Sequence, residues 1–209
     1  MVQVLAIAIQ RGFSNWSIIG VYAIKKMMQK GMLIDVDHMS QYAVDSTLQI
    51  ALRYNYPINS GHTGVRPASE NQRTYRQLNI ISRLGGLFGV GWSGQDAAGW
   101  VDNYRKGLRG MYNRGVCFGS DVNSIVFTPK PRAGSRVMYN DLGFSAPSSF
   151  GHTWNYNRDG MAHYSMVRDF VRDIRNMGNA NELSVLFSSA NEFYQMWQKC
   201  ERSRSAVRV

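Results

Sequence analysis

Apolar residues along this chain recur with two periods, one typical of helices and one typical of short strands. Spacings of three and four residues predict six helices. They fall at residues 17–30, 40–54, 75–84, 99–113, 162–177 and 181–200. Four short strand-like runs accompany them: MLIDVDH (32–38), NYPINSGHTG (55–64), LFGVGW (87–92) and GVCFGSD (115–121). Because right-handed crossovers make successive strands parallel, this order predicts an α/β chain with about four parallel strands and flanking helices.

Polar side chains end three of these strand-like runs. His38 and His62 come at or near the ends of the first two, and Asp121 ends the fourth. The carboxyl ends of parallel strands share one rim, so these three side chains are expected to lie close together. Neutral imidazoles bind zinc and related ions, and a nearby carboxylate can move protons. Two histidines satisfied by hydrogen bonds at strand ends fit the same pattern, because their spacing is not a metal signature.

The remainder of the chain indicates a loop followed by two packed helices. Residues 122–160 are rich in glycine, serine and aromatic residues, and they predict a long loop over the strand ends. The Met, Phe and Trp residues of the last two predicted helices recur at helical spacing, which favours core packing over a cofactor site. With 209 residues, 44% of them hydrophobic, the chain can bury one core, and residues 1–209 are interpreted as a single domain.

Composition and charge narrow the classes of function. The formal net charge of +10 is compatible with nucleic-acid binding, but the basic residues are scattered and densest in the tail at residues 201–209, which is expected to be solvated and frayed. Nucleic acid is therefore an unfavoured partner. Cys117 and Cys200 form no CxxC pair and no disulfide scaffold. The apolar stretch at residues 2–10 is too short for a transmembrane segment, and the compartment stays open.

Several segments resemble one known family. GMLIDVDHMS, NSGHTG, CFGSDVNS and DGMAHYSMVRDFVRDIRNMG occur in that family's order and at its approximate spacing, and NANELSVLFSSANEFYQMW matches its closing helices. Over roughly residues 17–200, the chain resembles the second half of the membrane dipeptidases (renal dipeptidase-like, peptidase family M19). These are metal-dependent amidohydrolases, so the resemblance implies strands five to eight of a (β/α)8 TIM-type barrel.

The resemblance implies a role for each of four residues. His38 and His62 match the metal-binding histidines after strands five and six, which implies zinc, as one or two divalent ions. Asp121 matches the aspartate after strand eight that handles protons during catalysis. Arg73 follows His62 by eleven residues and matches an arginine that grips a substrate carboxylate, a task that suits a bidentate guanidinium. A surface arginine on a helix explains the sequence around Arg73 equally well.

Other polar residues near these motifs have weaker counterparts in the family. Asp35 matches a family position and is expected at most to support a metal ligand from outside the metal site. Asp37 belongs to no part of the pattern that can be carried over. His152 and His163 lie in or after the long loop, where a helix-start role explains His163 as well as a family feature does.

The family's first half supplies metal and substrate residues that have no counterpart here. These are a His-x-Asp pair after strand one, a bridging glutamate after strand three and a substrate-binding histidine after strand four. The resemblance therefore implies an incomplete fragment of a zinc-dependent hydrolase that cleaves a dipeptide or similar small amide. The competing hypothesis is a non-catalytic remnant or subunit that acts as a binding module. Open sheet edges in half a barrel predict self-association or pairing with a missing N-terminal half.

Overall fold

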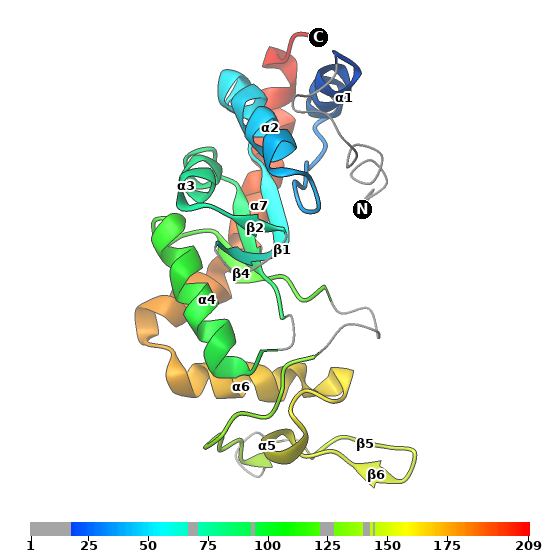
Figure 1. Cartoon of the computed structure of the whole chain (residues 1–209), viewed down its shortest axis with the longest axis vertical. Helices are drawn as coiled ribbons and strands as arrows, with labels where there is room; N and C mark the ends of the chain where they lie inside the picture. The colour runs from blue at the N-terminus through cyan, green and yellow to red at the C-terminus, as the bar shows by residue number, and fades with distance from the viewer. Residues whose placement is uncertain (1–17, 67–70, 93–94, 122–127, 140–142, 144) are drawn as a thin grey trace.

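The computed structural model describes residues 18–66, 71–92, 95–121, 128–139, 143 and 145–209. The helices are α1 (Ile18–Gln29), α2 (Gln41–Tyr54), α3 (Tyr75–Arg83), α4 (Ala97–Gly110), α5 (Tyr156–Asp159), α6 (Val167–Met177) and α7 (Ala180–Ser203). The strands are β1 (Asn59–Val65), β2 (Gln72–Arg73), β3 (Leu87–Val90), β4 (Val116–Phe118), β5 (Ser148–Ser149) and β6 (His152–Thr153). The 3₁₀ turns in the described part of the chain include η3 (Tyr164–Met166) and η4 (Arg204–Ala206). In Figure 1, α2, α3 and α4 lie along one side of the sheet and α7 runs behind it.

The main sheet has four strands in the order β2-β1-β3-β4, and every neighbouring pair is parallel. This confirms the predicted fold class of parallel strands with flanking helices. The strand expected at residues 32–38 is reduced to a single parallel bridge between Asp35 and Asn59. The fourth strand is instead β2, a two-residue segment that the apolar pattern does not predict, because a strand this short contains no alternation.

Polar residues at the helix ends explain why the predicted helices begin and end where they do. Ser40 caps α2 by accepting a hydrogen bond from the backbone of Ala43, and Asn55 ends that helix in the left-handed conformation. Thr74 and Gln77 form a reciprocal capping box at the start of α3. Asn179 and Glu182 form a second capping box that starts α7.

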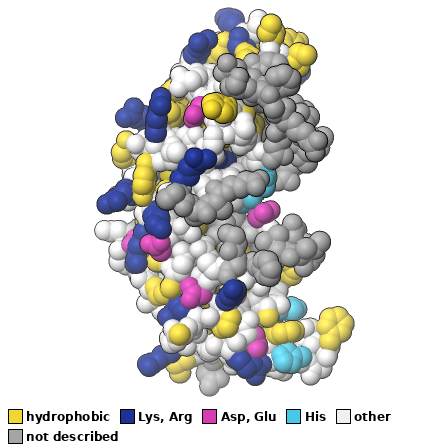
Figure 2. Space-filling model, in the orientation of Figure 1, with side chains coloured by type: hydrophobic (Ala, Val, Ile, Leu, Met, Phe, Trp, Pro, Cys, Tyr) yellow, Lys and Arg dark blue, Asp and Glu magenta, His cyan; other side chains and the backbone are white. Residues whose placement is uncertain are grey.

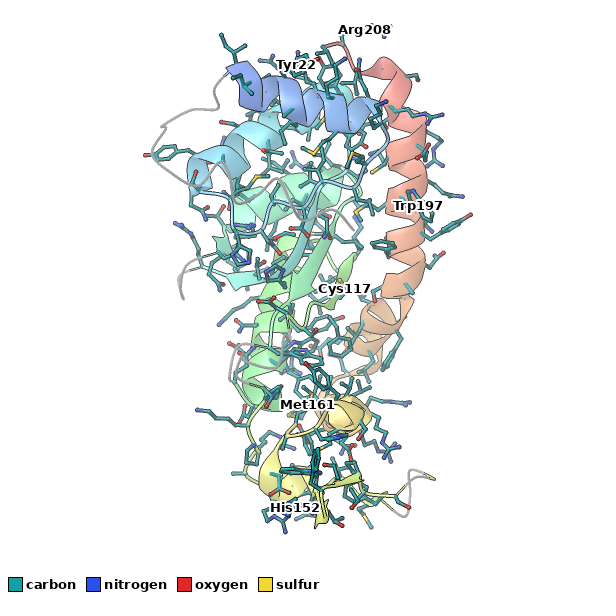
Figure 3. All side chains as sticks on the ribbon, turned by 90° about the vertical axis from the view of Figure 1, so that its right-hand side faces the viewer. Tyr22, Cys117, His152, Met161, Trp197 and Arg208 are labelled. Atoms are coloured by element: carbon teal, nitrogen blue, oxygen red, sulfur yellow. The ribbon has the colours of Figure 1, made fainter. Side chains whose placement is uncertain are left out.

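An aromatic cluster joins the sheet to the last helices. Trp100 of α4 is fully buried and stacks between Tyr104 and Phe118, with ring centroids 5.2 and 4.8 Å away. Phe170 of α6 meets the Trp100 ring edge-on at 5.9 Å. The prediction that the aromatic residues of the closing helices are core residues is therefore correct for α6. It is wrong for part of α7, where Trp197 points away from the body of the molecule (Figure 3).

The region expected as a long loop, residues 122–160, contains short regular elements where it is described. Strands β5 and β6 form an antiparallel hairpin whose turn residues, Phe150 and Gly151, both have positive φ. Helix α5 follows the hairpin, and Arg132 ties the region to α6 through an ion pair with Asp173. None of the helices in the described part of the chain combines the length and apolar character needed to cross a membrane.

The basic tail differs from its expectation, because it packs onto α1 and α2. Helix α7 continues to Ser203, and the side chain of Val207 is only 1% exposed. The backbone carbonyls of Val207 and Arg208 accept hydrogen bonds from Gln29 and Tyr54, at 3.1 and 2.8 Å. The tail is thus held by the buried side chain of Val207, which could not be expected from its pattern of charged residues.

Val207→Ala tests this anchor. We expect it to lower the free energy of unfolding by about 2 kcal/mol, since it removes buried methyl groups and leaves a small cavity. Chemical denaturation measures the change. Val209→Ala is the matched control, because that side chain is 48% exposed. Equal effects of the two substitutions would contradict a packed tail.

Candidate functional site

The structure brings together His38, His62 and Asp121, the three residues expected at the strand ends. Each offers one ligand atom, and these atoms all lie within 4.8 Å of one another. The Nε2 atoms of the two histidines are 2.8 Å apart, and Asp121 Oδ2 lies 3.8 Å from His62 Nε2. Figure 2 shows a histidine side chain and an acidic side chain close together at one edge of the molecule.

Irregular backbone places each of these side chains. His38 follows the bridge at Asp35 and has a φ of 61°, and Asp121 follows β4 with a φ of 48°. His62 was expected at the end of its strand, but β1 continues past it to Val65. The pairing of β1 with β3 shifts register between Ser60 and Thr63, and His62 lies within that irregularity. Such bulges redirect a side chain, and this one is associated with a histidine that faces the rim.

Glycines let the neighbouring strands approach this irregularity. A Cβ added at Gly89 would lie 1.9 Å from the carbonyl oxygen of Gly61, and one added at Gly119 would lie 1.8 Å from the same oxygen. Both contacts are with backbone, so no side-chain rotation can relieve them. Gly119 therefore needs to lack a side chain for Asp121, two residues later, to come close to the histidines.

Asp37 is the main group at the site that the sequence interpretation missed. Its carboxylate is buried, and Oδ2 accepts hydrogen bonds from the backbone of His62 at 2.7 Å and faces His62 Nδ1 at 3.0 Å. Oδ1 accepts from Ser60 at 2.6 Å and from Arg73 at 3.1 Å. The available signal was its position two residues after Asp35, because alternate residues of an extended segment share one face.

These contacts shift the ionisation of the pair. Burial alone would raise the pKa of Asp37, but the hydrogen bond from His62 and the charge of Arg73 outweigh it and hold that pKa below its ordinary value. The hydrogen bond to Asp37 raises the pKa of His62 above its ordinary value, against the opposite effect of burial. Asp37 is therefore the ionised partner that orients the His62 ring.

Asp35 has the opposite electrostatic environment. Burial, followed by the negative charge of Asp37, raises the pKa of Asp35 to about 7. Its Oδ2 accepts a hydrogen bond from Asn59 at 2.5 Å, and its Oδ1 accepts one from the backbone of Asp37 at 2.8 Å. Both hydrogen bonds of Asp35 are therefore to groups other than the histidine rings, and Asp35 is not one of the three residues whose ligand atoms converge.

The raised pKa of Asp35 predicts a pH-dependent contribution to stability. A carboxyl that binds its proton more tightly when folded stabilises the protein fully below the ordinary pKa of 3.8, and that contribution is lost as the pH rises toward about 7. We expect the wild type to lose unfolding free energy relative to Asp35→Asn across this range. Denaturant titrations at a series of pH values measure the difference, with Asp102→Asn as the control for loss of an exposed carboxylate. Parallel profiles for wild type and Asp35→Asn would sink the prediction.

Arg73 lies in β2 and is fully buried, so the interpretation of a surface arginine on a helix is wrong. Its guanidinium donates to Ser60, Asp37 and Asn71, and to the backbone carbonyls of Val36 and Gln72. A substrate carboxylate could reach Arg73 only if these partners moved. Carboxylate binding by Arg73 therefore stays a prediction.

The other histidines and the cysteine of β4 lie outside the cluster. His152 packs against Trp154 with ring centroids 4.3 Å apart, near the end of the molecule opposite α1 (Figure 3). His163 accepts a hydrogen bond from the backbone of Ser165 at the start of η3, which is the helix-start role considered from the sequence. Burial and nearby aspartates raise the pKa of Cys117 to about 12, so its thiol stays protonated near neutral pH.

The donor set of the cluster fits a divalent transition-metal ion. Because the Nδ1 atom of His62 faces the carboxylate of Asp37, its Nε2 atom is the one left to act as a ligand. Two imidazole nitrogens and a carboxylate oxygen are a set that zinc accepts, with open positions remaining for other ligands. Within the described residues, this is the group of three or more histidines and acidic residues whose ligand atoms converge.

Comparisons with known proteins bear on the fold. The sequence matches no protein-family model and no curated protein sequence. Solved structures do match. A dipeptidase of peptidase family M19 has a TM-score of 0.66 at 13% identity, covering 91% of this chain and 50% of that protein. A probable dipeptidase, PvdM, from Pseudomonas aeruginosa has a TM-score of 0.65 at 12% identity, covering 90% and 55%.

A third similar structure contains a bound dipeptide mimic. It is a metallopeptidase from Rhodobacter sphaeroides with a phosphinate mimic of the dipeptide L-Ala-D-Ala, with a TM-score of 0.66 at 13% identity and coverage of 91% of this chain and 48% of that protein. The chain thus spans about half the length of the solved structures that it matches. At these identities the likeness concerns the fold, which is metallo-dipeptidase-like and corresponds to part of a barrel of parallel strands and helices.

Proposed function

We propose that this chain carries part of the active site of a metal-dependent hydrolase that cleaves a dipeptide or a similar small amide. The observation that carries the proposal is the convergence of His38, His62 and Asp121 on the rim of a parallel sheet. The metallo-dipeptidase-like fold supports it, because sites of barrel enzymes lie at the carboxyl ends of the strands. The resemblance of the sequence motifs to the second half of the M19 dipeptidases supports the same assignment.

In this proposal His38 and His62 hold the metal, and zinc is the ion that their chemistry favours. A divalent ion at such a site supplies a Lewis acid for the amide carbonyl. Asp121 accepts a proton from the attacking water and returns it to the amine that leaves when the C–N bond breaks, so the products are a carboxylate and an amine. Its side chain is 47% exposed beside His62, within reach of solvent.

A metal analysis joined to an activity assay tests this function. Purified chain is expected to retain a divalent ion, and hydrolysis of a panel of dipeptides is expected to fall by at least about 100-fold in Asp121→Asn, as for loss of a general acid–base group. Activity of the chain alone is expected to be weak, because a complete two-metal site needs more ligands than this cluster offers. Asp102→Asn is the control. Stoichiometric metal that survives loss of both His38 and His62 would place the site elsewhere.

A non-catalytic binding module is the second candidate, and the small ligand set of the cluster favours it. The described residues bring together two imidazole nitrogens and one carboxylate oxygen, fewer ligands than a complete two-metal site needs. Metal binding without hydrolysis of any dipeptide, both alone and after mixing with a complementary half of such a barrel, would favour this candidate over the hydrolase.

We further propose that the outer face of α7 and the free edge of β4 pair with a complementary half-barrel. Phe187, Tyr194 and Trp197 lie at helical spacing on α7, and each is about half exposed. Strand β4 pairs with β3 on one side and has no second neighbour among the described strands. Trp197→Glu is expected to weaken association in sizing experiments, while Tyr42→Glu, at another exposed aromatic residue, is expected to leave it unchanged. A strictly monomeric chain with a cooperative melt would contradict pairing with a second copy. A chain that stays monomeric after mixing with a complementary half-barrel would contradict pairing with that half.

A further inference from the structure

Arg73 is the centre of a buried polar network beneath the candidate metal cluster. Its side chain has no exposed surface, and the hydrogen bonds to Ser60, Asp37 and Asn71 have donor–acceptor distances of 2.9, 3.1 and 2.9 Å. A guanidinium that leaves water needs such partners, because an unpaired buried charge is strongly destabilising. The fold therefore depends on the hydrogen bonds of this network to keep the Arg73 guanidinium buried.

One branch of the network leads to His62. Arg73 donates to Oδ1 of Asp37, and Ser60 donates to the same oxygen. The other oxygen of Asp37 holds both the backbone N–H and the ring Nδ1 of His62. Because the carboxylate is fixed at one oxygen and grips the histidine at the other, the His62 ring has one orientation, with Nε2 toward His38.

A second branch leads to His38. Arg73 Nη2 donates to the side-chain oxygen of Asn71, and that same oxygen accepts the backbone N–H of His38 at 2.8 Å. His38 and Asn71 both have left-handed backbone, with φ values of 61° and 59°. Non-glycine residues in this region are strained and persist only where their surroundings hold them. The Asn71 contact supplies that restraint for His38.

We propose that Arg73 is a positioning residue that sets both histidines for metal binding, His62 through Asp37 and His38 through Asn71. The inference rests on the proposed function. It differs from carboxylate binding by Arg73 in the environment that the guanidinium needs. Positioning needs the buried network that the structure contains. Carboxylate binding needs an exposed guanidinium.

The first test uses metal-free chain, so that it does not depend on metal binding. In wild type, ring ¹⁵N spectra at a pH where His62 is neutral are expected to show its proton on Nδ1, and the His38 amide is expected to exchange slowly with solvent. Arg73→Gln is expected to mix the tautomers of His62 and to speed exchange at His38. Arg73→Lys keeps a positive charge opposite Asp37 but lacks the several N–H donors of the guanidinium. It is therefore expected to keep the proton of His62 on Nδ1, while the His38 amide exchanges as fast as in Arg73→Gln.

Arg76→Gln is the matched control, because Arg76 is an exposed arginine three residues along the chain. Asn71→Gly covers the case in which Arg73→Gln does not fold. It permits the positive φ but removes the link, so it is expected to release the His38 amide and leave the His62 tautomer unchanged. A folded Arg73→Gln with both wild-type signals, or Asn71→Gly with full protection at His38, would overturn the positioning role.

The second test separates this role from substrate binding. Titration with Co²⁺, followed by its visible absorption, is expected to show affinity 10- to 100-fold weaker in Arg73→Lys, as for loss of an outer partner of a metal ligand. Unchanged Co²⁺ affinity with a raised KM for a dipeptide would identify Arg73 as a substrate-binding group and overturn the inference. A wild-type chain that binds no Co²⁺ would contradict the proposed function, while the metal-free spectra would still decide the role of Arg73.

Discussion

His38→Ala and His62→Ala are each expected to weaken divalent-metal binding by more than about 100-fold, beyond the loss that removal of a supporting partner produces. The reason is the small size of the cluster. The proposed metal ligands among the described residues are the imidazole nitrogens of His38 and His62, so either substitution removes half of them. Competition with a coloured chelator measures the affinity of each variant for Zn²⁺.

Thermal unfolding provides an independent measure of the same effect. An ion that binds only the folded chain raises the free energy of unfolding by about 2.7 kcal/mol at 100 times its dissociation constant. Wild type is expected to show this rise with added Zn²⁺, and the two histidine variants are expected to lose it. His152→Ala is the control, because His152 lies outside the cluster beside Trp154. Wild-type affinity in His38→Ala and in His62→Ala would rule out the cluster as the metal site.

Gly119→Ala is expected to lower the free energy of unfolding by about 3 kcal/mol or more, at the upper end of what overpacking produces. Its added Cβ would lie 1.8 Å from the carbonyl oxygen of Gly61 and 2.8 Å from the Cα of His62. Since both atoms belong to backbone, β1 and the end of β4 have to separate. That movement also carries Asp121 away from His62, so metal affinity is expected to fall in any variant that remains folded.

Gly99→Ala is the matched control for Gly119→Ala. The atoms nearest to a Cβ at Gly99 belong to side chains, and the closest is 3.2 Å away. Because Gly99 lies in α4, alanine there is expected to be neutral or stabilising through its higher helix propensity. Denaturation curves and Zn²⁺ titrations of the two variants make the comparison. A Gly119→Ala protein with wild-type stability would refute the close approach of the strands.

The candidate cluster shows where sequence patterns are sufficient and where they are not. His38, His62 and Asp121 could be grouped from sequence, because polar residues near the carboxyl ends of parallel strands lie near one rim. The grouping was right although β1 continues past His62 to Val65. Asp37 could not be assigned a role, since the pattern treats it as one more polar residue in a short strand. Its role comes from its two carboxylate oxygens. One accepts a hydrogen bond from Arg73, 36 residues away along the chain, and the other accepts one from His62, 25 residues away.

The sequence by itself determined the order of the main helices and of three of the four parallel strands, because helical and strand periods depend on residues that are neighbours in the chain. The exception is β2, which is too short to show a strand period. Caps such as Ser40 and Thr74 are equally local, so the helix boundaries followed closely. Only the tertiary structure decided the burial of Arg73, the anchoring of the tail by Val207 and the bulge that turns His62 toward His38. These depend on contacts between distant segments, and a residue's chemistry alone does not say which partner will remove it from water.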